Sequence, residues 1–138
     1  MVRTDPSGRY ACLYKRWHLI GLEAGISVAS VGLRSEATGC ATGFRADVVT
    51  TAKRDLKSGE MLDGEGGYTV YGKLYPSRDS LALGGLPLGL AHNVKLLNPI
   101  AAGAPVRWTD VKVDESATAV SFRREMERAF APTQEAAA

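Results

Sequence analysis

The fold is decided by two short segments of the same design: RDLKSGEML at Arg54–Leu62 and NPIAAGAPV at Asn98–Val106. Each contains a polar residue, then Asp or Pro, then Leu56 or Ile100, two residues, a glycine, two residues and a final apolar residue. We expect the aliphatic side chain to point inward, the glycine to form the turn, and the last residue to return to the core. A turn that is used twice in this way predicts a pseudo-symmetric β fold.

The repeat lies within residues 44–114, which are rich in β-branched residues and interrupted often by glycine and proline. This composition is typical of a small, loop-rich β module. Leu81–Leu90 is rich in Leu and Gly and is interrupted by Pro87. The β stretches expected in the module are Arg45–Lys53, Tyr68–Leu74, Val94–Leu97 and Val106–Val113.

An apolar helix is predicted before the module, at Trp17–Arg34, after a loose lead-in at Met1–Arg9. Its polar residues fall on one narrow stripe, and nearly all the others are apolar, so the helix should be buried nearly all round. A small domain covers one face of a helix. We therefore expect another copy of the chain or a larger protein to cover the rest. The stripe consists of Glu23, Ser27, Ser30 and Arg34.

A second helix is predicted at Ala117–Phe130, with Asp114 or Ser116 as its cap and a disordered tail from Pro132 onward. Its expected apolar stripe is Ala119, Phe122, Met126 and Phe130. The side chains expected to face water are Arg123, Arg124, Glu125, Glu127 and Arg128. The predicted class is thus α+β, with a β module at 44–114 between a head segment at 1–43 and a tail at 115–138.

Composition excludes several classes of function. The 138 residues suffice for one compact domain, and a net charge of +2 from scattered basic residues argues against nucleic acid as a partner. Cys12 and Cys40 match no zinc or redox spacing, and no secretory signal follows Arg3. The apolar run Leu19–Leu33 is shorter than the ~20 residues that span a bilayer and contains Glu23. A reduced, cytoplasmic protein that does not enter a membrane is expected.

The module resembles the SAF domain in the stretches AKRDLKSGEMLD (52–63) and NPIAAGAPVRWTDV (98–111). This resemblance implies a β-clip fold. SAF domains occur in sialic acid synthases, antifreeze proteins, flagellar P-ring chaperones and altronate dehydratases.

A closer resemblance covers most of the chain. Its stretches are HLIGLEAGISVAS (18–30), ADVVTTAKRDLKSGEMLDGEGGYTVYGKL (46–74), LPLGLAHNVKL (86–96) and RREMERAF (123–130). They resemble the C-terminal part of bacterial NAD(P)-dependent, homoserine-dehydrogenase-like oxidoreductases, which include deoxyxylulose-phosphate-reductoisomerase-like enzymes. The sequence contains no Gly-x-Gly-x-x-Gly after a strand, so we expect the nucleotide-binding domain to be absent from it. We expect either a fragment or remnant of such an enzyme, or a standalone protein whose partner chain supplies the rest. NAD(P) is implied for the full-length relatives, and no cofactor is expected in this chain.

Two candidate binding sites lie in the middle of the module. The stretch Asp63–Tyr68, with Glu65, is either a loop that meets a polar ligand or a glycine turn between strands. Tyr71 and Lys73 share one face of a predicted strand. Together they either bind a phosphate or carboxylate or form a solvated face.

A third candidate is formed by His92, Asn93 and Lys95. These residues are either a polar recognition group or a turn at the start of a strand. His18 and Glu23 are five residues apart, which is not a chelating spacing, and no cluster elsewhere fits zinc. No nucleophile motif is present, so no catalytic residue is predicted.

Three functions follow from these patterns. The first is a non-catalytic SAF module of a homoserine-dehydrogenase-like oxidoreductase, which caps the substrate site or joins subunits. Its partner is a nucleotide-binding domain or another copy of the chain. The second is a standalone module that binds a sugar or sugar acid. The third, a secreted chaperone of the flagellar type, would need a signal sequence.

Overall fold

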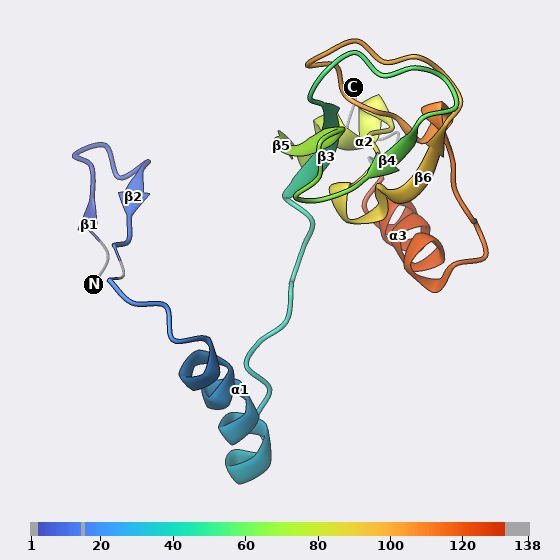
Figure 1. Cartoon of the computed structure of the whole chain (residues 1–138). Helices are drawn as coiled ribbons and strands as arrows, with labels where there is room; N and C mark the ends of the chain where they lie inside the picture. Colours follow the sequence, from blue (N-terminus) through green and yellow to red (C-terminus); the bar gives the residue numbers. More distant parts are fainter. Residues whose placement is uncertain (1–2, 15, 132–138) are drawn as a thin grey trace, which may run out of the picture. The chain divides into compact units, whose positions relative to one another are not determined.

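The structure, a computed structural model, describes residues 3–14 and 16–131. The chain divides into two compact units, residues 1–42 and residues 43–138. In Figure 1 the first unit is coloured blue to cyan and the second green to red. The class is α+β, as predicted, with antiparallel strand pairs and with helices on both sides of the β module in the sequence.

The first unit begins with a β-hairpin. Strands β1 (Arg3–Thr4) and β2 (Ala11–Cys12) pair antiparallel. The carboxylate of Asp5 closes the turn by accepting a hydrogen bond of 2.9 Å from the amide of Tyr10, and Gly8 has a φ of +68°. The predicted loose lead-in is therefore wrong for the described residues, because an Asp-Pro-Ser-Gly turn orders them.

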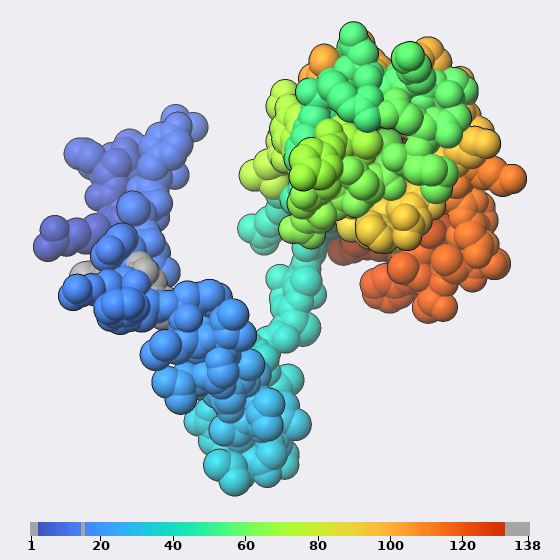
Figure 2. Space-filling model, viewed as in Figure 1, coloured from blue at the N-terminus to red at the C-terminus, as the bar shows by residue number. Residues whose placement is uncertain are grey.

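Helix α1 spans Ile20–Arg34 and so begins later than predicted, with no side-chain cap at Leu19. Its end is marked by the left-handed conformation of Ser35, and the guanidinium of Arg34 donates to the hydroxyl of Ser30 at 3.0 Å. Ser30 is the one described residue of α1 that is buried. The sequence predicts that α1 is buried on nearly all sides, and the first unit alone does not bury it in this way. Figure 2 shows one face of α1, in mid-blue to cyan.

The second unit holds two antiparallel sheets. One pairs β3 (Ala46–Ala52) with β5 (Val70–Pro76). The other has the order β4–β6–β7, with bounds Met61–Asp63, His92–Leu96 and Val111–Lys112. The helices are α2 (Ser77–Leu83), α3 (Thr118–Ala129) and the short 3-10 helices η1 (Leu88–Leu90) and η2 (Trp108–Asp110).

Several elements of this unit differ from the prediction. The stretch Val106–Val113, expected to be a strand, forms the 3-10 helix η2 and then the short strand β7, because the carboxylate of Asp110 accepts a hydrogen bond from the amide of Arg107. Strand β5 begins at Val70 rather than Tyr68, because the amides of Tyr68 and Thr69 bind the carboxylate of Asp63. Strand β6 begins at His92 rather than Val94. Helix α2 was not predicted, since its seven residues are too few to show a helical period.

The predicted pseudo-symmetry is present in the backbone. Leu56 and Ile100 exchange two hydrogen bonds, of 2.8 and 3.0 Å, where the two turns of the repeat meet. Gly59 and Gly103 follow them with φ of +86° and +77°. The amide of Gly59 donates to Leu96, and the amide of Gly103 donates in the matching way to Ala52. Each residue of the first copy thus corresponds to the residue 44 positions later.

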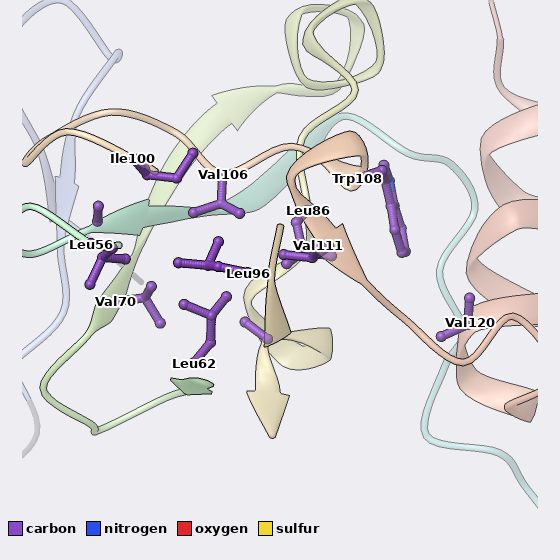
Figure 3. Close-up of a cluster of buried hydrophobic side chains, with 12 residues drawn as sticks. Leu56, Leu62, Val70, Leu86, Leu96, Ile100, Val106, Trp108, Val111 and Val120 are labelled. Atoms are coloured by element: carbon purple, nitrogen blue, oxygen red, sulfur yellow. The ribbon is translucent and has the colours of Figure 1, made fainter. Parts of the chain in front are cut away.

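The repeat also builds the core of the second unit (Figure 3). Leu56 and Ile100 are buried, and the residues that close the two segments, Leu62 and Val106, are 1% and 0% exposed. Trp108 and Val120 lie on the side of the cluster nearest α3. The remaining members of the cluster are Ala52, Val70, Leu86, Ala91, Leu96 and Val111.

Helix α3 is rotated relative to the prediction. Val120 is its buried residue, whereas Phe122 is 71% exposed, so the expected apolar stripe is wrong. The side chain of Arg123, expected to face water, is only 12% exposed, because it binds Asp47 and Glu127. The predicted cap is also wrong: Asp114 accepts hydrogen bonds from Ser116, and the helix begins without a side-chain cap. The tail from Pro132 onward lies outside the described residues.

Candidate functional site

A bulge in β6 brings several predicted site residues together. The pairing with β4 passes from Leu62–Val94 to Asp63–His92, which leaves Asn93 as the extra residue, with a φ of +56°. A bulge of this kind changes the direction in which the neighbouring side chains point. As a result His92 lies on the same sheet face as Lys95, although three positions separate them in sequence.

The ring of His92 is held by the backbone of β4. Its Nδ1 lies 3.0 Å from the carbonyl oxygen of Asp63. A carbonyl oxygen only accepts hydrogen bonds, so Nδ1 is the donor in this contact. The backbone is close on this side: a Cβ added at Gly64 would lie 3.0 Å from the Cβ of His92.

The loop Asp63–Tyr68 is closed by its own first residue. The carboxylate of Asp63 accepts hydrogen bonds from the amides of Tyr68 and Thr69, at 2.5 and 3.0 Å, and from the hydroxyl of Thr69. Partial burial would raise the pKa of this carboxyl, but the hydrogen bonds from Thr69 and Tyr68 outweigh it and lower the pKa from 3.8 to about 2. Two of the loop amides expected to meet a ligand are therefore already occupied.

An open groove lies beside the bulge, between β6, β7 and the first turn of α3. Its volume is about 830 Å³. His92, Asn93 and Lys112 line it together with Asp114 and Glu115. Its apolar wall consists of Leu90, Val94, Val113, Ala117, Ala119 and Val120. The groove is large enough for a small organic ligand.

The other predicted residues lie elsewhere in the unit. Tyr71 and Lys73 are exposed on β5, in the sheet with β3, and the Nζ of Lys73 is 5.8 Å from the centre of the Tyr75 ring. Glu65 is exposed in the loop after Asp63. The structure therefore places His92 and Asn93 in the lining of the groove. Lys95, Tyr71, Lys73 and Glu65 lie outside that lining.

Two features were missed from the sequence. One is Lys112 on β7. The apolar residues on either side of it indicate a strand with an outward lysine, but they do not indicate which strand pairs with it. Asp47, 7% exposed, accepts two hydrogen bonds from Arg123, at 3.1 and 2.6 Å, and a third from Ser80. The spacing of Arg123 and Glu127 by four positions predicts an ion pair on α3 but not its burial.

A second group of contacts extends this network along α3. The guanidinium of Arg124 lies 3.7 Å from the centre of the Trp108 ring, and the indole nitrogen of Trp108 donates to Glu127 at 3.1 Å. These side chains are engaged with one another, which indicates that the network fixes α3 rather than performing chemistry.

Within residues 3–14 and 16–131, no group of three or more His, Cys, Asp or Glu side chains is placed to hold a metal ion. In the same part of the chain, no helix has both the length and the hydropathy needed to cross a bilayer. A scan of the sequence against known protein families finds no match. A search of curated proteins likewise finds no relative. The resemblance of the motifs to the SAF group therefore remains a proposal.

Proposed function

We propose that this chain is a non-catalytic SAF module of a homoserine-dehydrogenase-like, NAD(P)-dependent oxidoreductase, which caps the substrate site or assists subunit assembly. The observation that carries the proposal is the surface of the first unit. Among the described residues of that unit, eleven large hydrophobic residues are exposed: Tyr10, Leu13, Tyr14, Trp17, Leu19, Ile20, Leu22, Ile26, Val28, Val31 and Leu33.

Such a surface favours docking on another protein. Burying one large apolar side chain contributes about 1.5–3 kcal/mol, and a patch of this size is rare on an isolated protein. The residues of α1 lie on more than one face of the helix, so a single second helix would cover only part of them. A groove on a larger domain covers them better, and the motif resemblance suggests the nucleotide-binding oxidoreductase domain.

The test is association with that domain. The chain is mixed with the nucleotide-binding domain of a homoserine-dehydrogenase-like enzyme, prepared without its own SAF module, and the mass is measured by light scattering. We expect a stable complex that the double change Leu22→Asp, Ile26→Asp abolishes. The matched control is Phe122→Asp on α3, which alters an equally exposed apolar residue of the second unit and should leave the complex intact.

The proposal also concerns the isolated chain. Calorimetry should detect no binding of NADPH, because the expected nucleotide site lies in the partner domain. Tight binding of NADPH by the chain alone, or an unchanged complex with the double variant, would contradict the proposal.

A standalone module that binds a sugar or sugar acid is the second candidate, and the groove beside His92 and Asn93 favours it. It requires no partner domain. A panel of sugar acids titrated into the chain distinguishes the two, since saturable binding lost on Asn93→Ala would support the second candidate.

A further inference from the structure

The solvent face of the β4–β6–β7 sheet carries an unusual pair of charges. Lys95 on β6 and Lys112 on β7 are directly opposite each other, and both are exposed. Such opposed residues lie about 5.5 Å apart at their Cα atoms when hydrogen-bonded, and like charges in this position destabilise a sheet. A negative charge close to both ammonium groups would offset this repulsion.

Among the described residues, no carboxylate forms an ion pair with either lysine. The two acids that flank β7 are engaged locally. Asp110 accepts from the amide of Arg107 at 2.9 Å and from Asn98, and Asp114 accepts from Ser116 at 2.9 Å.

The bulge adds a third group to this face. Met61 of β4 is opposite Lys95, and Asp63 is opposite His92, so His92 lies beside the two lysines on the same side of the sheet. With Nδ1 held by the carbonyl of Asp63, the ring directs Nε2 away from the backbone of β4. His92 and Lys112 also contribute to the lining of the groove, whereas Lys95 lies outside it.

We propose that Lys95, Lys112 and His92 form a binding site for the phosphate group of a small phosphate monoester on the solvent face of this sheet. Two ammonium groups match the charge of about −1.5 to −2 that a phosphate monoester carries at neutral pH, and a single carboxylate leaves one of them unpaired. Because Nδ1 of His92 is engaged by Asp63, Nε2 is the ring nitrogen that can hydrogen-bond to the ligand. This site does not depend on the oxidoreductase partner proposed above.

The test is isothermal calorimetry on the full chain with glycerol 3-phosphate, in a buffer free of phosphate and sulfate. Glycerol serves as the uncharged comparator and lactate as the singly charged one. We expect saturable binding of glycerol 3-phosphate, weaker binding of lactate and none of glycerol. The double change Lys95→Met, Lys112→Met keeps the aliphatic stems and should weaken binding by about tenfold or more.

The matched control is Lys73→Met, which removes an exposed strand lysine from the other sheet. It should leave the affinity unchanged, whereas a non-specific charge effect would weaken binding by every lysine variant. The proposal is overturned if glycerol 3-phosphate does not saturate, if lactate binds as tightly, or if Lys73→Met has the effect of the double variant. Binding of the oxidoreductase domain is a separate measurement, so either proposal can fail alone.

Discussion

At the scale of single residues, Asp63 shows how a candidate ligand residue became a structural one. Its carboxylate accepts hydrogen bonds from Tyr68 and Thr69 and thereby closes the glycine loop. Gly67 permits this closure, since a Cβ there would lie 2.2 Å from the Cγ of Asp63. The loop is therefore a structural turn that connects β4 of one sheet to β5 of the other.

This arrangement predicts a pH dependence of stability. The folded-state pKa of Asp63, about 2, lies below its ordinary value of 3.8. The ionised carboxylate therefore stabilises the fold above pH 4, and this contribution is lost as the pH falls toward 2. Asp63→Asn should lower the melting temperature at pH 6 and shrink the difference between pH 6 and pH 2, because an amide cannot accept all three hydrogen bonds. Melting is followed by circular dichroism.

A second variant distinguishes the hydroxyl donor of Thr69 from the two amide donors. Thr69→Val removes the hydroxyl but keeps both amides, so it should produce part of the same change. Some pH dependence should survive in both variants, because the pKa values of Glu60 and Asp114 are also lowered, by hydrogen bonds from Arg54 and Ser116. If Asp63→Asn melts with the same pH dependence as the wild type, the carboxylate does not close the loop.

At the scale of elements, α3 is held to the module mainly by polar contacts. Beyond Val120, its attachment includes the ion pair of Arg123 with Asp47, the contact of Arg123 with the Phe44 ring, and the contacts of Arg124 and Glu127 with Trp108. Arg123→Ala should destabilise the second unit by about 3 kcal/mol or more, because it leaves the carboxylate of Asp47 buried without its cation. Urea unfolding measures the change in free energy.

Arg128→Ala is the matched control, since Arg128 is an exposed arginine on the same helix. Its change should stay within about 0.5 kcal/mol, as is usual for surface positions. Equal destabilisation by the two variants would show that helix propensity, rather than the buried ion pair, determines the stability of α3.

The same helix shows where sequence analysis succeeded and where it did not. Its existence and bounds were predicted to within one residue at each end, because helical sequence signals are local. Its orientation was wrong, because periodicity assumes that Phe122 and Met126 point inward. The partners that draw Arg123 inward, Asp47 and Ser80, lie far away in sequence. The bulge at Asn93 was missed for the same reason, since it is defined by pairing with β4.

At the scale of the whole molecule, the two units differ in what stabilises them. The second unit has a core built from both copies of the repeat, and the positions of Leu56 and Ile100 in it followed directly from the sequence pattern. The first unit has a closed hairpin and a helix but almost no buried side chains. The sequence predicted that α1 needs a cover, because its apolar residues exceed what one small domain can bury.

Limited proteolysis should therefore separate the units. Residues 35–43 form no helix or strand and are exposed, so cleavage by a glutamate-specific protease is expected at Glu36. The fragment that contains residues 43–131 should keep its circular dichroism spectrum and cooperative melting, because its core includes no residue from the first unit. The released N-terminal fragment should lose helical signal, since an isolated helix of fifteen residues is marginal in water. A C-terminal fragment that unfolds on cleavage would instead mean that the first unit contributes to the stability of the second.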